Sequence, residues 1–168
     1  MPYTDHFKLT DDLIQHLDIV FGALNDPFIE SRYTGFLAVS AVTVYELAIK
    51  TIFNEFAEKK HKVFGTFSNA HFEKLNGRIM IGSLKGEHVK RFGDKYVARF
   101  KKKLDVRERA FLKAHGASVR TSYGNVITWR HAFAHTGVIP ATATYLEVKT
   151  AYQHGKEIIH CLAESMRH

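Results

Sequence analysis

Apolar residues recur at three- and four-residue steps along most of this chain, which is the spacing of one face of an α-helix. Only three prolines interrupt the 168 residues, and residues with high helix propensity are plentiful. The length is that of one domain with a core of its own. The pattern therefore predicts an all-α protein that forms a single domain over residues 1–168.

The first half of the chain predicts two helices. Thr10 is placed to cap the first, which continues to about residue 24, and a turn signal follows at residues 25–27. The second helix begins between residues 28 and 31 and continues to about residue 60. Its apolar residues occupy more than one side, which predicts a central helix or one that faces both a core and a second subunit.

Glu46 lies in the middle of this long helix, and Lys50 follows four residues later. We favour an exposed Glu–Lys pair, which stabilises a helix by about 0.3 kcal/mol. The alternative is a buried carboxylate that reaches a basic group on a neighbouring helix.

The middle of the chain predicts shorter elements. A loop is expected at residues 65–69, followed by a short helix at residues 70–75 and a glycine-rich connector. Two helices are then expected at residues 87–104 and 105–114, the second ending at Gly116.

Two further helices complete the chain. Ser118 is placed to cap the penultimate helix, Gly137 is well placed as its left-handed C-terminal residue, and Pro140 prevents it from resuming. Thr142 or Thr144 caps the last helix, which continues nearly to the end of the chain.

Positive charge is concentrated in one segment. Residues 85–120 hold twelve Lys or Arg against four Asp or Glu, so this segment alone exceeds the net charge of +7 of the whole chain. A clustered cationic surface attracts polyanions through counterion release and steering. We therefore expect contact with nucleic acid, the alternative being a charged, solvated helix face. The residues assigned to substrate binding are Lys101, Lys102, Lys103, Arg107 and Arg120.

The sequence carries no sign of export or membrane insertion. The lone cysteine, Cys161, excludes an internal disulfide and agrees with a reducing, cytoplasmic compartment. The N-terminus has no signal-peptide pattern, and the longest apolar run, residues 35–44, is too short to span a bilayer. A cytoplasmic protein without membrane contact is expected.

The densest chemistry of the chain lies in the last two turns of the penultimate helix, which hold Arg130, His131 and His135. The two histidines have the i, i+4 spacing of half a zinc site, but no glutamate or nearby cysteine accompanies them, so no metal is expected. A second interpretation is structural: these residues cap and pack a helix end, where the dipole favours a histidine cation.

The third interpretation is RNA cleavage without metal or cofactor. Attack by the 2′-hydroxyl needs a base for its proton, an acid for the 5′-leaving oxygen and a cation for the phosphate. Histidine transfers protons near neutral pH, and arginine holds phosphate with a fork of donors. Positions five apart differ by about 140° around a helix, so Arg130 and His135 do not share a face unless the helix end unwinds. A two-fold homodimer eases this, because each subunit offers its helix end to a common groove.

The segment Arg130-His131-Ala132-Phe133-Ala134-His135 resembles the Arg-x4–6-His motif of the HEPN superfamily, in which a polar residue often follows the arginine. As in that family, a Thr-Gly pair and one final long helix follow the motif. A long helix that contains the Tyr-Glu-Leu sequence of residues 45–47 precedes it. The layout is similar to the RiboL-PSP type of HEPN domain over about residues 28–166.

The resemblance implies an up-and-down bundle, here of four to six helices, that forms a homodimer with both motifs lining one cleft. It also implies a metal-independent endoribonuclease, as found in toxin–antitoxin and phage-defence systems, with an antitoxin or another protein regulator as partner. By this resemblance His135 would be the acid/base, Arg130 would bind phosphate, and His131 would be a supporting polar group. Apart from the resemblance, we expect Glu46 and Asn125 to support the site. Other members are non-catalytic, so an RNA-binding or scaffold module is the alternative.

Overall fold

The computed structural model describes residues 2–75 and 77–167, and the elements within them are helical. The α-helices are α1 (Phe7–Ala23), α2 (Pro27–Lys60), α3 (Lys62–Phe72), α4 (Ile81–Ser83), α5 (Asp94–His115), α6 (Val119–Thr136) and α7 (Tyr145–Ser165). Short 3-10 or π turns precede α1 and connect α4 to α5, namely η1 (Tyr3–His6), η2 (Leu84–His88) and η3 (Val89–Phe92). The all-α prediction is confirmed. The α-helices exceed the predicted range by one, because α4 is a single three-residue turn.

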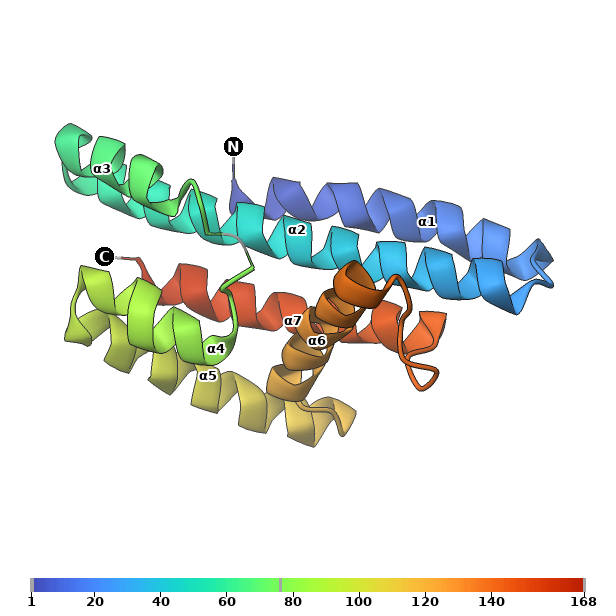
Figure 1. The fold of residues 1–168 in the computed structure, drawn as a ribbon. Coiled ribbons are helices and arrows are strands. Elements are labelled where there is room, and N and C mark those ends of the chain that lie inside the picture. The colour runs from blue at the N-terminus through green and yellow to red at the C-terminus, as the bar shows by residue number, and fades with distance from the viewer. Residues whose placement is uncertain (1, 76, 168) are drawn as a thin grey trace.

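Helix α2 is the central element of the bundle, since it packs against α1, α3, α6 and α7 (Figure 1). It begins at Pro27, one residue before the predicted range of 28–31, and the Asp26 carboxylate accepts the N–H groups of Phe28 and Ile29. Its buried residues cover several sides of the helix. The prediction of a central helix is confirmed.

By length and hydropathy, α2 also contains a window that is apolar enough to cross a membrane. Within the structure, however, 56% of that window is buried against neighbouring helices. A helix in the core of a bundle passes the same test of length and hydropathy.

The other long helices are arranged around α2 (Figure 1). Helix α1 forms a hairpin with α2, and α3 folds back on the other end of α2. Helix α7 lies between α2 and α5, while α6 crosses steeply and contacts both α2 and α7. Helix α6, which carries the Arg/His segment, is therefore anchored by two of the best-buried helices.

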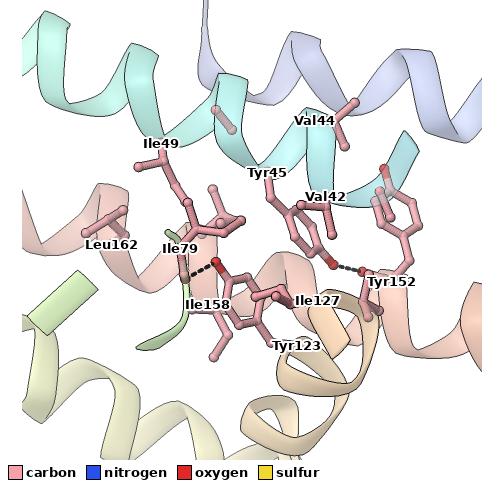
Figure 2. Packing of buried hydrophobic residues seen from close by; sticks show 14 of the residues in the cluster. Val42, Val44, Tyr45, Ile49, Ile79, Tyr123, Ile127, Tyr152, Ile158 and Leu162 are labelled. Carbon is pink, nitrogen blue, oxygen red and sulfur yellow. Dashed lines mark hydrogen bonds between the residues drawn. The ribbon is translucent and has the colours of Figure 1, made fainter. Parts of the chain in front are cut away.

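Three tyrosines form the centre of the core, where α2, α6 and α7 meet (Figure 2). The ring of Tyr45 stacks between those of Tyr123 and Tyr152, with centroid distances of 5.2 and 5.7 Å. Tyr123 Oη donates to the Ile79 carbonyl at 2.8 Å, and Tyr45 Oη donates to the Tyr152 carbonyl at 2.6 Å. The buried hydroxyls are thus satisfied, and the first half of α6 is fixed to the connector after α3.

The predicted cap at Thr10 is wrong, because this residue is buried inside α1 and its hydroxyl bonds Ser40 Oγ at 2.7 Å. The helix begins earlier, directly after η1. A hydroxyl that precedes acidic residues is typical of a helix cap, but here it forms a hydrogen bond between α1 and α2.

Two predictions in the middle of the chain are also wrong. The expected loop at residues 65–69 is part of α3, where Gly65 allows a close approach to α2: a Cβ at this position would lie 3.0 Å from Glu58. From residue 94 onward, the separate helices expected at residues 87–104 and 105–114 are one helix, α5, since no glycine or proline lies within it. Residues 87–92 lie instead in η2 and η3, and Gly93, with a φ of 112°, separates them from α5. The end of α5 at Gly116 is as predicted.

Candidate functional site

The ends of α6 follow the local sequence signals. Ser118 Oγ accepts the N–H of Thr121 at 3.0 Å, and Gly137 adopts a left-handed conformation with φ of 68°. The Gly137 N–H closes the helix on the Phe133 carbonyl at 2.8 Å. Both predicted ends are confirmed, and the Arg/His segment lies in the last two turns of the helix.

His131 and His135 form an exposed pair at this end of α6. Their rings contact edge to face, with centroids 4.2 Å apart. Neither ring has a hydrogen-bond partner within residues 2–75 and 77–167, so both leave ring nitrogens open to a ligand. No other His, Cys, Asp or Glu of the described chain joins them in a group of three that could hold a metal ion. The pair can exchange protons with a bound molecule.

Arg130 points to a different side of α6 and is half-buried. A Cβ placed on Gly77 would lie 3.5 Å from Arg130 Nη1 and 3.6 Å from Glu46 Oε1, so these two side chains flank the backbone of the connector after α3. Gly77 has a φ of +77°, which favours glycine at this position. The guanidinium therefore sits beside a carboxylate that lies 84 positions earlier in the sequence.

The sequence left two interpretations of Glu46 open. The favoured one, an exposed ion pair with Lys50, is wrong. Glu46 Oε1 is buried, and no described residue offers it a hydrogen bond. Lys50 Nζ instead donates to the Glu73 carbonyl at 2.8 Å. Burial raises the pKa of Glu46, while Arg130, Lys50 and the Gly77 backbone oppose that rise. The structure is closer to the alternative prediction: the half-buried carboxylate lies beside Arg130 of α6, although the two form no ion pair.

One chain does not bring Arg130 and His135 together. Arg130 lies on the side of α6 that also carries the buried residues Tyr123 and Ile127, whereas His131 and His135 are exposed. This is the separation that the geometry of an ideal helix predicts. The Arg/His segment thus presents two chemical faces: an inner arginine beside Glu46 and an outer pair of imidazoles.

Two residues that the sequence interpretation missed hold this helix end on α2. A Cβ at Gly35 would lie 2.2 Å from the ring of Phe133, so glycine is required for the ring to pack there. Arg32 donates to the Gly137 carbonyl and so satisfies an acceptor past the end of α6. The isolated glycine inside an apolar helix was the signal that could have indicated this close approach.

The basic residues assigned to substrate binding differ in their surroundings. Lys101 and Lys102 are exposed on α5. Lys103 Nζ lies 3.1 Å from Glu164 Oε2, and Arg107 forms ion pairs with both Glu164 and Glu157. Part of the positive charge of α5 therefore holds this helix against α7.

Arg120 and Asn125 lie away from the histidine pair. Arg120 is in the first turn of α6 and forms an ion pair with Asp105, which lowers the pKa of that carboxyl. At 1.5 Å per residue, about 22 Å of helix separates Arg120 from His135, and about 15 Å separates Asn125 from it. The structure does not gather either residue into the Arg/His segment.

Comparison with known proteins agrees with this arrangement. The RiboL-PSP-HEPN family model matches residues 4–168, which include α2 with Glu46, the basic helix α5 and the Arg/His segment of α6. No curated protein and no solved structure gives a match. On the extent of the family match, this chain is a member of the RiboL-PSP-HEPN family.

Proposed function

We propose that this protein is a metal-independent endoribonuclease that cleaves single-stranded or tRNA-like RNA. The observation that carries the proposal is the exposed, contacting pair of His131 and His135 in the family's Arg-x4–6-His position, with Arg130 in the same helix end. Membership of an RNA-related family and the excess of positive charge on α5 support the same substrate class.

The chemistry needs no cofactor. The 2′-oxygen of a ribose forms a bond to the adjacent phosphorus, and the bond from phosphorus to the 5′-oxygen breaks. His135 serves as the acid/base that moves a proton in this exchange, His131 supports it, and Arg130 stabilises the negative charge on the phosphate. The products are a 2′,3′-cyclic phosphate and a free 5′-hydroxyl, and the protons balance.

The proposed enzyme acts as a homodimer, because Arg130 and His135 face different sides of α6 in one chain. An apolar groove of about 480 Å³ lies between α1 and α2 and is lined in part by Phe36, whose side chain is 57% exposed. The Phe36 ring contacts Phe133 of α6 at a centroid distance of 5.8 Å. We assign this groove to a second copy of the chain, since its continuity with the end of α6 would bring the two helix ends toward one cleft.

The decisive experiment incubates total RNA with the wild-type protein in EDTA and identifies the product ends. We expect cleavage that yields 2′,3′-cyclic phosphates and that is lost in His135→Ala and in Arg130→Ala. His115→Ala is the matched control, because His115 is also an exposed histidine in the last turn of a helix that ends at a left-handed glycine. Cleavage that persists in both variants, or that requires added metal, contradicts the proposal.

A non-catalytic RNA-binding or adaptor module is the second candidate. The observation that favours it is the inward position of Arg130 beside Glu46 and Gly77, away from the histidines. This candidate predicts salt-sensitive RNA binding that His135→Ala leaves unchanged, with no product formed.

The cellular role that fits the proposed nuclease is a cytoplasmic toxin or phage-defence effector, held in check by an antitoxin or another protein regulator. An unregulated ribonuclease would damage the RNA of its own cell. Co-purification of a partner that suppresses RNA cleavage by the wild-type protein is the expected result.

A further inference from the structure

A pocket of about 520 Å³ lies between α5 and the end of α7, remote from the Arg/His segment. Its lining is dominated by basic side chains: Arg99, Lys102, Lys103, Arg107 and Arg167, with Glu164 as the acidic member. Like charges that lie close together repel each other, and carboxylates or a bound anion reduce that repulsion.

The basic residues of this pocket fall into two groups. Lys103 and Arg107 are held by Glu164 through ion pairs of 3.1 and 2.9 Å, so they form a fixed wall. Arg99, Lys102 and Arg167 have no carboxylate within ion-pair distance among the described residues. Arg99 Nη1 instead donates to the Arg167 carbonyl at 3.0 Å.

Arg99 and Lys102 are three residues apart on α5, so they project from neighbouring positions on one helix face. A phosphate entering the pocket would meet these cations without first breaking an ion pair. Two adjacent phosphates of a nucleic acid backbone would use both.

The pocket and the loop that follows the Arg/His segment lie at opposite ends of α7. Glu164 lies in the last turn of α7, whereas the loop that follows α6 enters α7 at Tyr145. At 1.5 Å per residue, about 28 Å separates these two points of α7. Figure 1 likewise shows the C-terminus and the connection between α6 and α7 at opposite ends of α7.

We propose that the α5–α7 pocket is a second phosphate-binding site, which holds the backbone of an RNA strand at the end of α7 opposite the loop that follows the Arg/His segment. The inference rests on the proposed function for the position of the cut. A stacked strand rises about 3.4 Å per nucleotide, so about nine stacked nucleotides cover the length of α7 between Tyr145 and Glu164. Shorter RNA occupies one site at a time.

The test measures binding and cleavage with single-stranded RNAs of about 4 and about 16 nucleotides. One is shorter and the other longer than the span of about nine nucleotides. Binding is measured on the His135→Ala background, where the RNA stays intact, as a function of salt concentration. The pocket variant is Arg99→Ala with Lys102→Ala. The matched control is Arg109→Ala with Lys113→Ala, which removes one arginine and one lysine from exposed positions nearer the other end of α5.

We expect the pocket variant to lower the slope of log affinity against log salt for the long RNA by about 1.4, since each lost contact with a single strand contributes about 0.7. In an otherwise wild-type protein, it should raise KM for the long RNA several-fold more than KM for the short RNA. The control should change neither the salt dependence of binding nor KM.

If the pocket variant and the control lower the salt dependence of binding equally, the inference is overturned, because the whole of α5 then attracts RNA diffusely. Equal effects on the short and the long RNA overturn it too, because the pocket would then not act at a distance. If the wild-type protein cleaves no RNA but the pocket variant alone loses salt-dependent binding, the phosphate site stands and the nuclease proposal fails.

Discussion

The two halves of α6 have opposite surroundings. In the first half, Tyr123 is fully buried, stacks on Tyr45 and donates to the Ile79 carbonyl. In the last two turns, His131 and His135 are exposed and contact each other. One half supplies packing and a buried hydrogen bond to the fold, and the other offers imidazoles to solvent. Substitutions along this helix should therefore separate stability from activity.

The largest effect on stability is expected for Tyr123→Ala. Loss of a fully buried aromatic ring that packs between α2 and α7 should lower the free energy of unfolding by about 3–5 kcal/mol. Tyr123→Phe keeps the ring but leaves the Ile79 carbonyl without its donor, which should cost about 1–3 kcal/mol. Urea unfolding followed by circular dichroism measures both. If Tyr123→Ala lowers the free energy of unfolding by less than Tyr123→Phe does, the first half of α6 does not stabilise the fold through this ring.

The next largest effect is expected for Gly35→Ala. The added Cβ would lie 2.2 Å from the Phe133 ring, so the end of α6 must shift, at a cost of about 1–3 kcal/mol. Gly124→Ala is the control within α6, because its Cβ meets nothing within 4 Å and alanine favours a helix interior by about 0.5–1 kcal/mol. Thermal unfolding of the two variants should move in opposite directions. A stabilised Gly35→Ala protein would show that Phe133 does not anchor the helix end.

A smaller, pH-dependent effect is expected for Glu46→Gln, within about 1 kcal/mol of wild type. Burial raises the pKa of Glu46 above its ordinary value of 4.5, so the folded protein binds this proton more tightly than the unfolded chain does. The stabilising contribution of the group is complete below pH 4.5 and is lost as the pH rises through the raised pKa. Glutamine does not titrate, so the variant should gain stability relative to wild type as the pH rises. A difference that is constant with pH would contradict this.

The smallest effect on stability, and the largest on activity, is expected for His135→Ala. Removal of an exposed ring should change the free energy of unfolding by less than about 0.5 kcal/mol. RNA cleavage should fall by about 100-fold or more, the usual contribution of a general acid or base. Unfolding and cleavage measured on the same preparation make the comparison direct. If His135→Ala is strongly destabilised and loses cleavage only in proportion to its unfolded fraction, the two halves of α6 do not differ in the way described.

The local signals of the sequence determined the fold class and several helix ends. Asp26 with Pro27, Ser118 and Gly137 each act on backbone groups within a few residues, so their effects could be predicted without knowing the fold. The same holds for Thr144, whose capping box with Glu147 opens α7. The HEPN resemblance likewise depended on a contiguous motif, and the family match agrees with it.

Only the tertiary structure decided which side chains meet across the bundle. Glu46 of α2 and Arg130 of α6 both lie against the backbone at Gly77. Arg107 pairs with two carboxylates of α7 that lie at least 50 positions further along the chain. Helix periodicity gives the direction in which a residue points from its own helix, but not the neighbour that packs there. The sequence therefore determined the helices and their chemical residues, whereas packing decided which charges are engaged and which remain available.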